Sequence, residues 1–211
     1  MGVQERRERE RSETRDKILD AARELFIKEG FDGVSMRKVA EKIEYSPTAI
    51  YVHFANKEEL FLELCHSDFH RLAEKFLKLA QIPDPVEKLR QIGRAYIEFG
   101  LKNPNHYRMM FMTAHPQIPD HVERDMGKGN PEEDAYEFLR LTVEEAMRAG
   151  AFRDDLTNAD LIAQTLWAAS HGVVSLQIAK RDDHWVPWCP VEDRTDVMLD
   201  GMLSGLLKKG R

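Results

Sequence analysis

The sequence has few of the features that mark secreted or disulfide-stabilised proteins. Its 211 residues include two cysteines, Cys65 and Cys189, which are too few for a disulfide framework or a cysteine-rich zinc site. The segment from Gln4 to Arg11 is almost entirely charged and has no apolar stretch like that of a secretory signal peptide. We therefore expect a soluble protein of the reducing cytoplasm.

The sequence also lacks a segment with the character of a membrane helix. The stretch from Leu161 to Ala179 carries no formal charge over 19 residues, which is close to the length of a spanning helix. Six of these residues are nevertheless polar, namely Gln164, Thr165, Ser170, His171, Ser175 and Gln177. Because such side chains are costly in lipid, the stretch predicts a helix buried within protein.

Catalytic and cofactor-binding motifs are absent as well. The sequence contains no Gly-x-Ser-x-Gly nucleophile turn, no glycine-rich phosphate loop and no His-Glu-x-x-His zinc pattern. His66 and His70 are spaced like two metal ligands on one helix face, but the nearby Asp68 belongs to another face of that helix. We therefore expect neither an enzyme nor a metal or cofactor site.

The composition is that of a globular protein with a mixed surface. Three Trp, ten Phe and five Tyr supply enough apolar material for a core. The 31 basic and 37 acidic side chains give a net charge of -6, which argues against indiscriminate coating of nucleic acid but permits a local contact face. Residues 1–57 hold 12 basic and 11 acidic side chains, so this end of the chain is the one better suited to a polyanion.

Helix signals recur along the whole chain, and no alternation of polar and apolar residues is long enough to indicate a strand. Cap residues, cap–proline pairs and helix-ending glycines divide the chain into about nine helices. We expect helices from Ser12 or Thr14 to Gly30, after Ser35, and over 46–54, 56–83, 84–102, 103–112, 130–150, 157–180 and 193–208, with a loop over 116–129. The predicted fold is all-α.

The first sixty residues predict a helix-turn-helix, in which one short helix braces another so that the second can enter a major groove about 12 Å wide. The apolar residues that would brace it are Val39, Ile43, Ile50 and Phe54. We expect residues 1–58 to form a DNA-binding domain, with 1–12 as a flexible arm. Residues 59–211 would form a second helical domain that binds an effector and dimerises.

A dense set of residues carries a family resemblance. These residues are Thr14–Ala22, Leu25, Phe26, Gly30, Phe31, Val34–Met36, Val39, Ala40, Ser46–Phe54 and Lys57–Leu60. Over about 47 residues, this segment resembles the DNA-binding domain of TetR-family transcriptional regulators. The resemblance implies a homodimer that binds a double-stranded DNA operator, most often as a repressor.

The resemblance also implies roles for single residues. It would place five residues near the bases, namely Ser46, Pro47, Thr48, Ala49 and Val52. It would place four residues on the phosphate backbone, namely Arg37, Tyr51, His53 and Lys57. By their pattern alone, His53 and Tyr51 could instead belong to the core. Glu44 departs from the family because the turn between the helices usually has a glycine there; a positive φ at Glu44 would cost on the order of 1 kcal/mol.

Small residues on the last two long helices favour a dimer. Apolar residues occupy three sides of the 161–179 helix, which predicts burial nearly all round. The residues that would let helix backbones approach across a two-fold interface are Ala168, Gly172, Ala179, Gly201 and Gly205. Members of the family usually dimerise in this way, although the same residues could pack within one chain.

Aromatic and methionine side chains in the middle helices favour an irregular, mainly apolar ligand cavity. The expected ligand residues are Tyr96, Phe99, Tyr107, Met110, Phe111, Phe138, Trp167 and His171. Trp167, His171 and Gly172 also resemble a Trp-His-Gly motif of one TetR subgroup, which implies a pocket but not its occupant. Such a cluster could equally be ordinary core.

These observations predict a ligand-responsive regulator. We expect a repressor that binds a near-palindromic operator as a homodimer and is released by a small, mainly apolar effector. The alternative is a helical adaptor that binds a small molecule without sequence-specific DNA binding.

Overall fold

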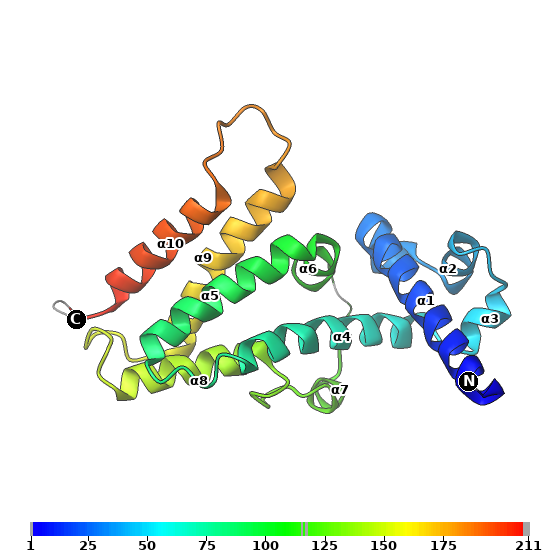
Figure 1. Ribbon diagram of the computed structural model, residues 1–211, viewed down its shortest axis with the longest axis horizontal. Helices are drawn as coiled ribbons and strands as arrows, with labels where there is room; N and C mark the ends of the chain where they lie inside the picture. The colour runs from blue at the N-terminus through cyan, green and yellow to red at the C-terminus, as the bar shows by residue number, and fades with distance from the viewer. Residues whose placement is uncertain (1, 115, 117, 209–211) are drawn as a thin grey trace. The chain divides into compact units, whose positions relative to one another are not determined.

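The computed structural model describes residues 2–114, 116 and 118–208, and over these residues the chain forms ten helices and no strand beyond a single bridge between Phe152 and Leu207 (Figure 1). The predicted all-α fold is thereby confirmed. The helices are α1 (Val3–Gly33), α2 (Met36–Lys42), α3 (Pro47–Tyr51), α4 (Lys57–Leu77), α5 (Pro85–Lys102), α6 (Pro104–Phe111), α7 (Asp120–Asp125), α8 (Ala135–Arg148), α9 (Ala159–Lys180) and α10 (Val191–Leu206).

The helices belong to two compact units. Unit 1 comprises the described residues up to Asp68 together with those from Asn105 to Ile118, and unit 2 comprises the remainder. Unit 1 is therefore discontinuous in sequence: it contains α1 to α3, the first part of α4 and most of α6. This division differs from the two contiguous domains, 1–58 and 59–211, that we expected from the sequence.

Several helices begin at the cap residues that the sequence indicates. The Ser35 hydroxyl accepts a hydrogen bond from the Lys38 amide at the start of α2, and Ser46 accepts one from the Ala49 amide at the start of α3, each at 3.3 Å. Asn56 and Asp84 cap α4 and α5 in the same way, and proline follows the cap in α3 and α5. These local signals set the limits of the helices around the site.

The amino-terminal helix is longer than we predicted. We expected a flexible arm over 1–12 and a cap at Ser12 or Thr14, but α1 begins at Val3 and the Thr14 hydroxyl donates to the Glu10 carbonyl oxygen inside the helix. Ion pairs one turn apart, Arg6–Glu10 and Arg9–Glu13, accompany this helical conformation.

Further along the chain other helix limits also differ from the prediction, and α4 ends at Leu77 rather than near Pro83. The expected loop over 116–129 contains α7. Asn130 stabilises only a turn, because its side chain accepts from the Glu132 amide, and α8 begins later, where Asp134 accepts from two backbone amides. Asn158, rather than Thr157, caps α9. For α8 and α9, a neighbouring side chain with the same capping chemistry forms the cap.

Unit 1 has a core of aromatic rings and one enclosed ionic cluster. The rings of Phe26, Phe31 and Phe61 contact one another with centroid distances of 5.1 to 5.8 Å. Asp68 on α4 is 0% exposed; it accepts two hydrogen bonds from Arg23 on α1, at 3.1 and 3.3 Å, and a third from Nδ1 of His106 on α6, at 2.7 Å. This cluster ties α6 to the amino-terminal helices.

Unit 2 packs α5 against α8, α9 and α10. The contact between α5 and α10 is close at Gly93, where a Cβ atom would lie 2.5 Å from a methyl group of Leu199. In α9, one face is buried through Ile162, Leu166 and Val174, while the opposite face is exposed, so the predicted burial on all sides is not found within one chain. Among the described helices, none combines the length and apolar character needed to cross a bilayer.

Candidate nucleic-acid interface and ligand site

The short helix α3 packs against the rest of unit 1 through its apolar side. Val39 and Ile50 are 0% exposed and Phe54 is 1% exposed, as expected for the bracing set; Ile43 is half-buried. Behind this helix, Arg15 of α1 lies over the Phe54 ring, with its guanidinium carbon 4.9 Å from the ring centroid. The position of α3 is therefore fixed by enclosed contacts.

The other side of α3 is open. Tyr51 is 54% exposed and Val52 is 63% exposed, although both are large and at least partly apolar. Ser46, Pro47 and Thr48 at the start of the helix are exposed as well, and Ala49 is half-buried. The residues expected to approach bases thus form one accessible face, and Tyr51 does not belong to the core.

The residues expected to contact phosphates differ in their surroundings. Arg37 is exposed and its Nε donates to Glu41 at 2.8 Å. The Lys57 ammonium donates to the Phe31 carbonyl oxygen at 3.0 Å and lies 4.1 Å from the centroid of the Phe31 ring, so it also holds α4 to α1. Burial lowers the pKa of His53, and the positive charges of Arg11 and Arg15 lower it further. The His53 imidazole is therefore biased toward its neutral form.

Glu44 has the backbone conformation that its place in the turn requires. Its φ is 60°, the only positive φ of a non-glycine residue in the described part of the chain. A side chain in this region is strained by on the order of 1 kcal/mol. The turn between α2 and α3 therefore keeps the geometry that glycine would favour, at some cost in stability.

The expected ligand residues divide between the two units. Tyr107, Met110 and Phe111 belong to unit 1, where the rings of Tyr107 and Phe111 are 4.9 Å apart. The other five, Tyr96, Phe99, Phe138, Trp167 and His171, belong to unit 2. In unit 2, Phe99 and Phe138 are buried, and the Phe138 ring contacts Phe76 of α4 at 6.2 Å.

Tyr96, Trp167 and His171 come together as a hydrogen-bonded cluster between α5 and α9. The Trp167 indole nitrogen donates to the Tyr96 hydroxyl at 2.8 Å, and this hydroxyl lies 3.4 Å from Nδ1 of His171. Burial lowers the pKa of His171, which favours the neutral imidazole. Trp167 is 37% exposed, so a cluster of neutral polar groups within an aromatic setting reaches the surface of unit 2.

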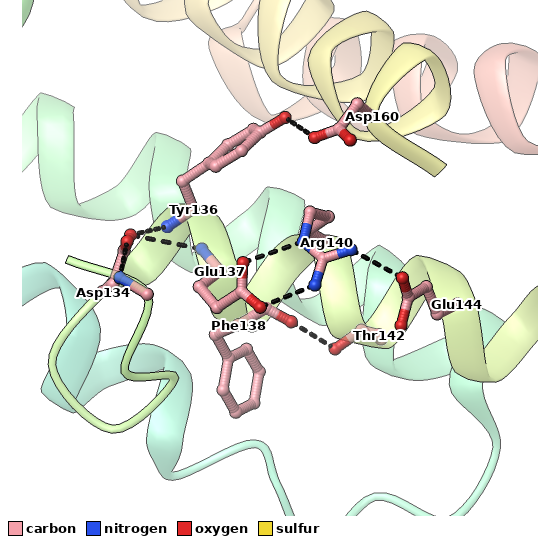
Figure 2. Close-up of polar contacts among 9 residues, drawn as sticks. Asp134, Tyr136, Glu137, Phe138, Arg140, Thr142, Glu144 and Asp160 are labelled. Atoms are coloured by element: carbon pink, nitrogen blue, oxygen red, sulfur yellow. Dashed lines mark hydrogen bonds and ion pairs between the residues drawn. The ribbon is translucent and has the colours of Figure 1, made fainter. Parts of the chain in front are cut away.

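Tyr136 extends this arrangement and was not predicted from the sequence. Its hydroxyl donates to Asp160 at 2.6 Å and accepts from Gln164 at 3.2 Å, and its ring centroid is 6.1 Å from that of Trp167. Figure 2 shows the Tyr136 side chain reaching from α8 toward Asp160 at the start of α9. The available signal was the spacing of Asp160, Gln164 and Trp167, which are three or four residues apart on one helix.

A hollow of about 660 Å³ lies beside this region and is open to solvent. Its lining residues are Arg140, Glu144, Met147, Arg148, Thr157, Asn158, Ala159 and Asp160, none of which is among the eight ligand residues expected from the sequence. Arg140 lies between Glu137 and Glu144, as Figure 2 shows, and the hydrogen bonds that it donates to these carboxylates raise its pKa above the ordinary value. Because most of its lining residues are polar or charged, this hollow suits a mainly apolar effector less well than the cluster around Trp167.

The exposed faces of α9 and α10 contain the small residues expected at a dimer interface. Ala168, Ala179, Gly201 and Gly205 are exposed. A Cβ atom added at Gly172, Gly201 or Gly205 would meet open space. Exposed apolar side chains accompany them: Leu161 and Leu176 on α9, and Val197, 74% exposed, on α10.

Comparisons with known proteins find one family model for the amino-terminal part of the chain and another for the carboxy-terminal part. The family model described as "Bacterial regulatory proteins, tetR family" matches residues 18–64, and the model described as "Tetracyclin repressor-like, C-terminal domain" matches residues 89–202. The HTH-type transcriptional repressor NicS of Pseudomonas putida is 30% identical over 158 residues, which are 72% of this chain and 73% of that protein.

Two further proteins show how the similarity is distributed. The HTH-type transcriptional repressor AcnR of Corynebacterium jeikeium is 40% identical over 63 residues, only 30% of this chain and 33% of that protein. The structure of the TetR-family regulator PfmR from Thermus thermophilus has a TM-score of 0.70 at 22% identity and covers 92% of this chain and 97% of the other, which shows the shared fold. The chain therefore belongs to the tetR family of bacterial transcriptional regulators.

Proposed function

We propose that this regulator is a repressor that binds a near-palindromic operator as a homodimer and is released by a small, mainly apolar effector. The observation that carries the DNA-binding part is the exposed face of α3. Thr48, Tyr51 and Val52 are accessible while Ile50 and Phe54 behind them are enclosed. Exposure of a tyrosine and a valine on a rigidly braced helix is explained by contact with a partner surface.

The exposed faces of α9 and α10 support a homodimer. Glycine and alanine let helix backbones approach closely, and Leu161, Leu176 and Val197 supply the apolar area that would be buried. A two-fold dimer presents two α3 helices, so it would read two half-sites related by the same symmetry. A DNA operator as partner also supports a cytoplasmic location.

The cluster of Tyr96, Trp167 and His171 supports an effector site in unit 2. It combines aromatic surface with a few polar atoms, the composition usual in small-molecule sites. An effector that binds more tightly to a conformation with wrongly spaced α3 helices lowers operator affinity, by no more than the ratio of its two affinities. Helix α4 contributes residues to both units and is the covalent route for such coupling.

The first experiment is selection of random duplex DNA on the full-length protein at about 150 mM salt, where purely electrostatic binding is weakened. We expect an enriched near-palindrome. Tyr51→Ala should then lower affinity for the enriched duplex at least about tenfold with the dimer intact, since it removes a contact that fixes the position of α3 on the duplex. Lys78→Ala, which removes an exposed charge in unit 2, is the control and should bind normally.

The second experiment tests the effector site. Compounds that release the enriched duplex are identified by fluorescence anisotropy and then applied to Trp167→Ala. This variant should bind operator within about tenfold of the wild type but need much more effector for release. Trp185→Ala is the matched control, because Trp185 is 92% exposed in the loop after α9. Equal effector sensitivity in Trp167→Ala and the wild type would remove Trp167 from the site.

A well-folded dimer that enriches no DNA sequence would overturn the repressor proposal. Tight binding of a small molecule by the same preparation would then favour the alternative, a helical adaptor. If light scattering shows a monomer at micromolar concentration, the proposed dimer is contradicted. The variant Gly172→Glu tests the dimer further in the same measurement. This substitution points into open space in one chain, so it should prevent dimerisation without unfolding the protomer.

A further inference from the structure

The first turns of α1 extend the helix beyond the part that packs in unit 1. Figure 1 shows this amino-terminal end, in dark blue, running past α3. The segment from Glu5 to Glu13 contains four arginines and four glutamates, so its net charge is zero. Its charges are nevertheless arranged in two distinct sets.

One set is internally paired. Arg6 pairs with Glu10 and Arg9 pairs with Glu13, at 2.8 and 3.6 Å, and Glu5 accepts from the Gly2 amide. At 100° per residue, these five side chains lie on the side of α1 away from Ile18 and Ala22, the residues that face the core of unit 1. Their positive charges are therefore neutralised by neighbours on the same face.

The other set consists of Arg7 and Arg11. Both are exposed, and within the described residues neither makes an ion pair or a hydrogen bond, not even with Glu8, which lies three residues before Arg11. On the helix they share an arc of about 80° with Arg15, Ile18 and Ala22, so they continue the packed face of α1 outward from unit 1. Each is about 6 Å further along the axis than the next.

Contacts within unit 1 show where this line of arginines leads. Arg15 lies over the Phe54 ring and pairs with Glu63 at 2.9 Å, next to the end of α3. Arg11, one turn earlier, is close enough to His53 for its charge to lower the pKa of that imidazole. His53 directly follows the exposed residues Tyr51 and Val52. Because Arg15 is paired with Glu63 and His53 is biased toward its neutral form, Arg11 and Arg7 are, within the described chain, the exposed, unpaired positive charges on this line of α1.

We propose that Arg7 and Arg11 bind DNA backbone phosphates and that the amino-terminal turns of α1 form an additional, sequence-independent part of the DNA contact. This inference rests on the proposed function. A free guanidinium on a preformed helix donates well to phosphate oxygens, whereas the paired Arg6 and Arg9 would first have to break their ion pairs. The contact adds affinity without changing which operator is read.

The test compares two double variants of equal net charge. Arg7→Gln/Arg11→Gln removes the unpaired set, and Arg6→Gln/Arg9→Gln removes the paired set. Affinity for the enriched duplex and for a duplex of unrelated sequence is measured by anisotropy over about 50 to 300 mM KCl. For Arg7→Gln/Arg11→Gln, the slope of log affinity against log salt should become shallower by about 1.8 per protomer, since each lost phosphate contact accounts for about 0.9. Arg6→Gln/Arg9→Gln should change the slope by less than half as much.

Further measurements separate the possible failures. Arg7→Lys/Arg11→Lys should restore most of the slope, and circular dichroism should show that all variants are folded. Equal slopes for the two glutamine variants, or an unchanged slope for Arg7→Gln/Arg11→Gln, would overturn the inference. A wild-type protein that binds both duplexes equally would overturn the proposed function alone, because the slope comparison can still be made. A wild-type protein that binds neither duplex would overturn both.

Discussion

Each unit contains a buried polar network, and the two networks differ in how completely they are enclosed. In unit 1, the ionic cluster of Arg23, Asp68 and His106 is centred on a carboxylate with no solvent exposure. In unit 2, Tyr96 and Trp167 form a network of neutral groups that reaches solvent through the partly exposed indole. Water can replace a partner lost from the exposed Trp167 indole but not one lost from the Asp68 carboxylate. The first network therefore maintains the geometry of unit 1, whereas the second can exchange partners with a ligand.

The largest expected difference between the networks is in their effect on stability. Asp68→Ala should lower the free energy of unfolding by about 3 kcal/mol, because it leaves the buried Arg23 with only the exposed Asp20, at 2.9 Å, as a counter-charge. Tyr96→Phe should lower it by only about 1 kcal/mol, since the Trp167 indole can turn to water. Urea unfolding followed by circular dichroism measures both values. Equal losses in the two variants would show that the networks do not differ in enclosure.

A smaller effect concerns Glu44, which is strained but lies on the surface of unit 1. Glu44→Gly should raise the free energy of unfolding by about 1 kcal/mol, because glycine adopts a positive φ without steric cost. Glu41→Gly, the same replacement within α2, should lower it by about 1 kcal/mol. The effect of Glu44→Gly should add to that of Asp68→Ala, since the two sites share no partner. Strong non-additivity would mean that the strained turn and the ionic cluster are coupled.

The smallest effect is a pH dependence in the network of unit 2. Burial lowers the pKa of His171 below its ordinary value of 6.5, so folding favours the neutral imidazole. The resulting stabilisation is present above pH 6.5 and is lost as the pH falls through the lowered pKa of the folded state. Wild-type stability should therefore fall more between pH 7 and pH 5 than that of His171→Gln. Urea midpoints at the two pH values test this, and parallel changes in both proteins would contradict it.

The sequence predicts the helices around α3 well because their signals are local. A serine followed by proline fixes the start of α3 through contacts within three residues. The predicted start of α8 was wrong because Asn130-Pro131-Glu132-Glu133 also has a cap residue followed by proline, but it forms only a turn before Asp134. When two capping residues lie four positions apart, tertiary packing decides between them.

The polar networks could be predicted only in part. Tyr96, Trp167 and His171 were expected to share a site, but nothing in their spacing indicates that the indole donates to the tyrosine hydroxyl across two helices. Arg23, Asp68 and His106 were not expected to meet, because they are separated by 45 and 38 residues. Each of these side chains would be ordinary on a helix surface. Their roles depend on helix packing that the local pattern does not specify.

The discontinuity of unit 1 has a consequence for the recombination of parts between related regulators. A chimaera cut after residue 58 would take α3 with its exposed face but leave behind α4 from Glu59 onward and all of α6, including the parts of both helices that belong to unit 1. Arg23 would then meet whatever residue the acceptor protein has in place of Asp68. An exchangeable cassette should instead include residues 105–118, or at least keep Arg23, Asp68 and His106 together as one inherited set.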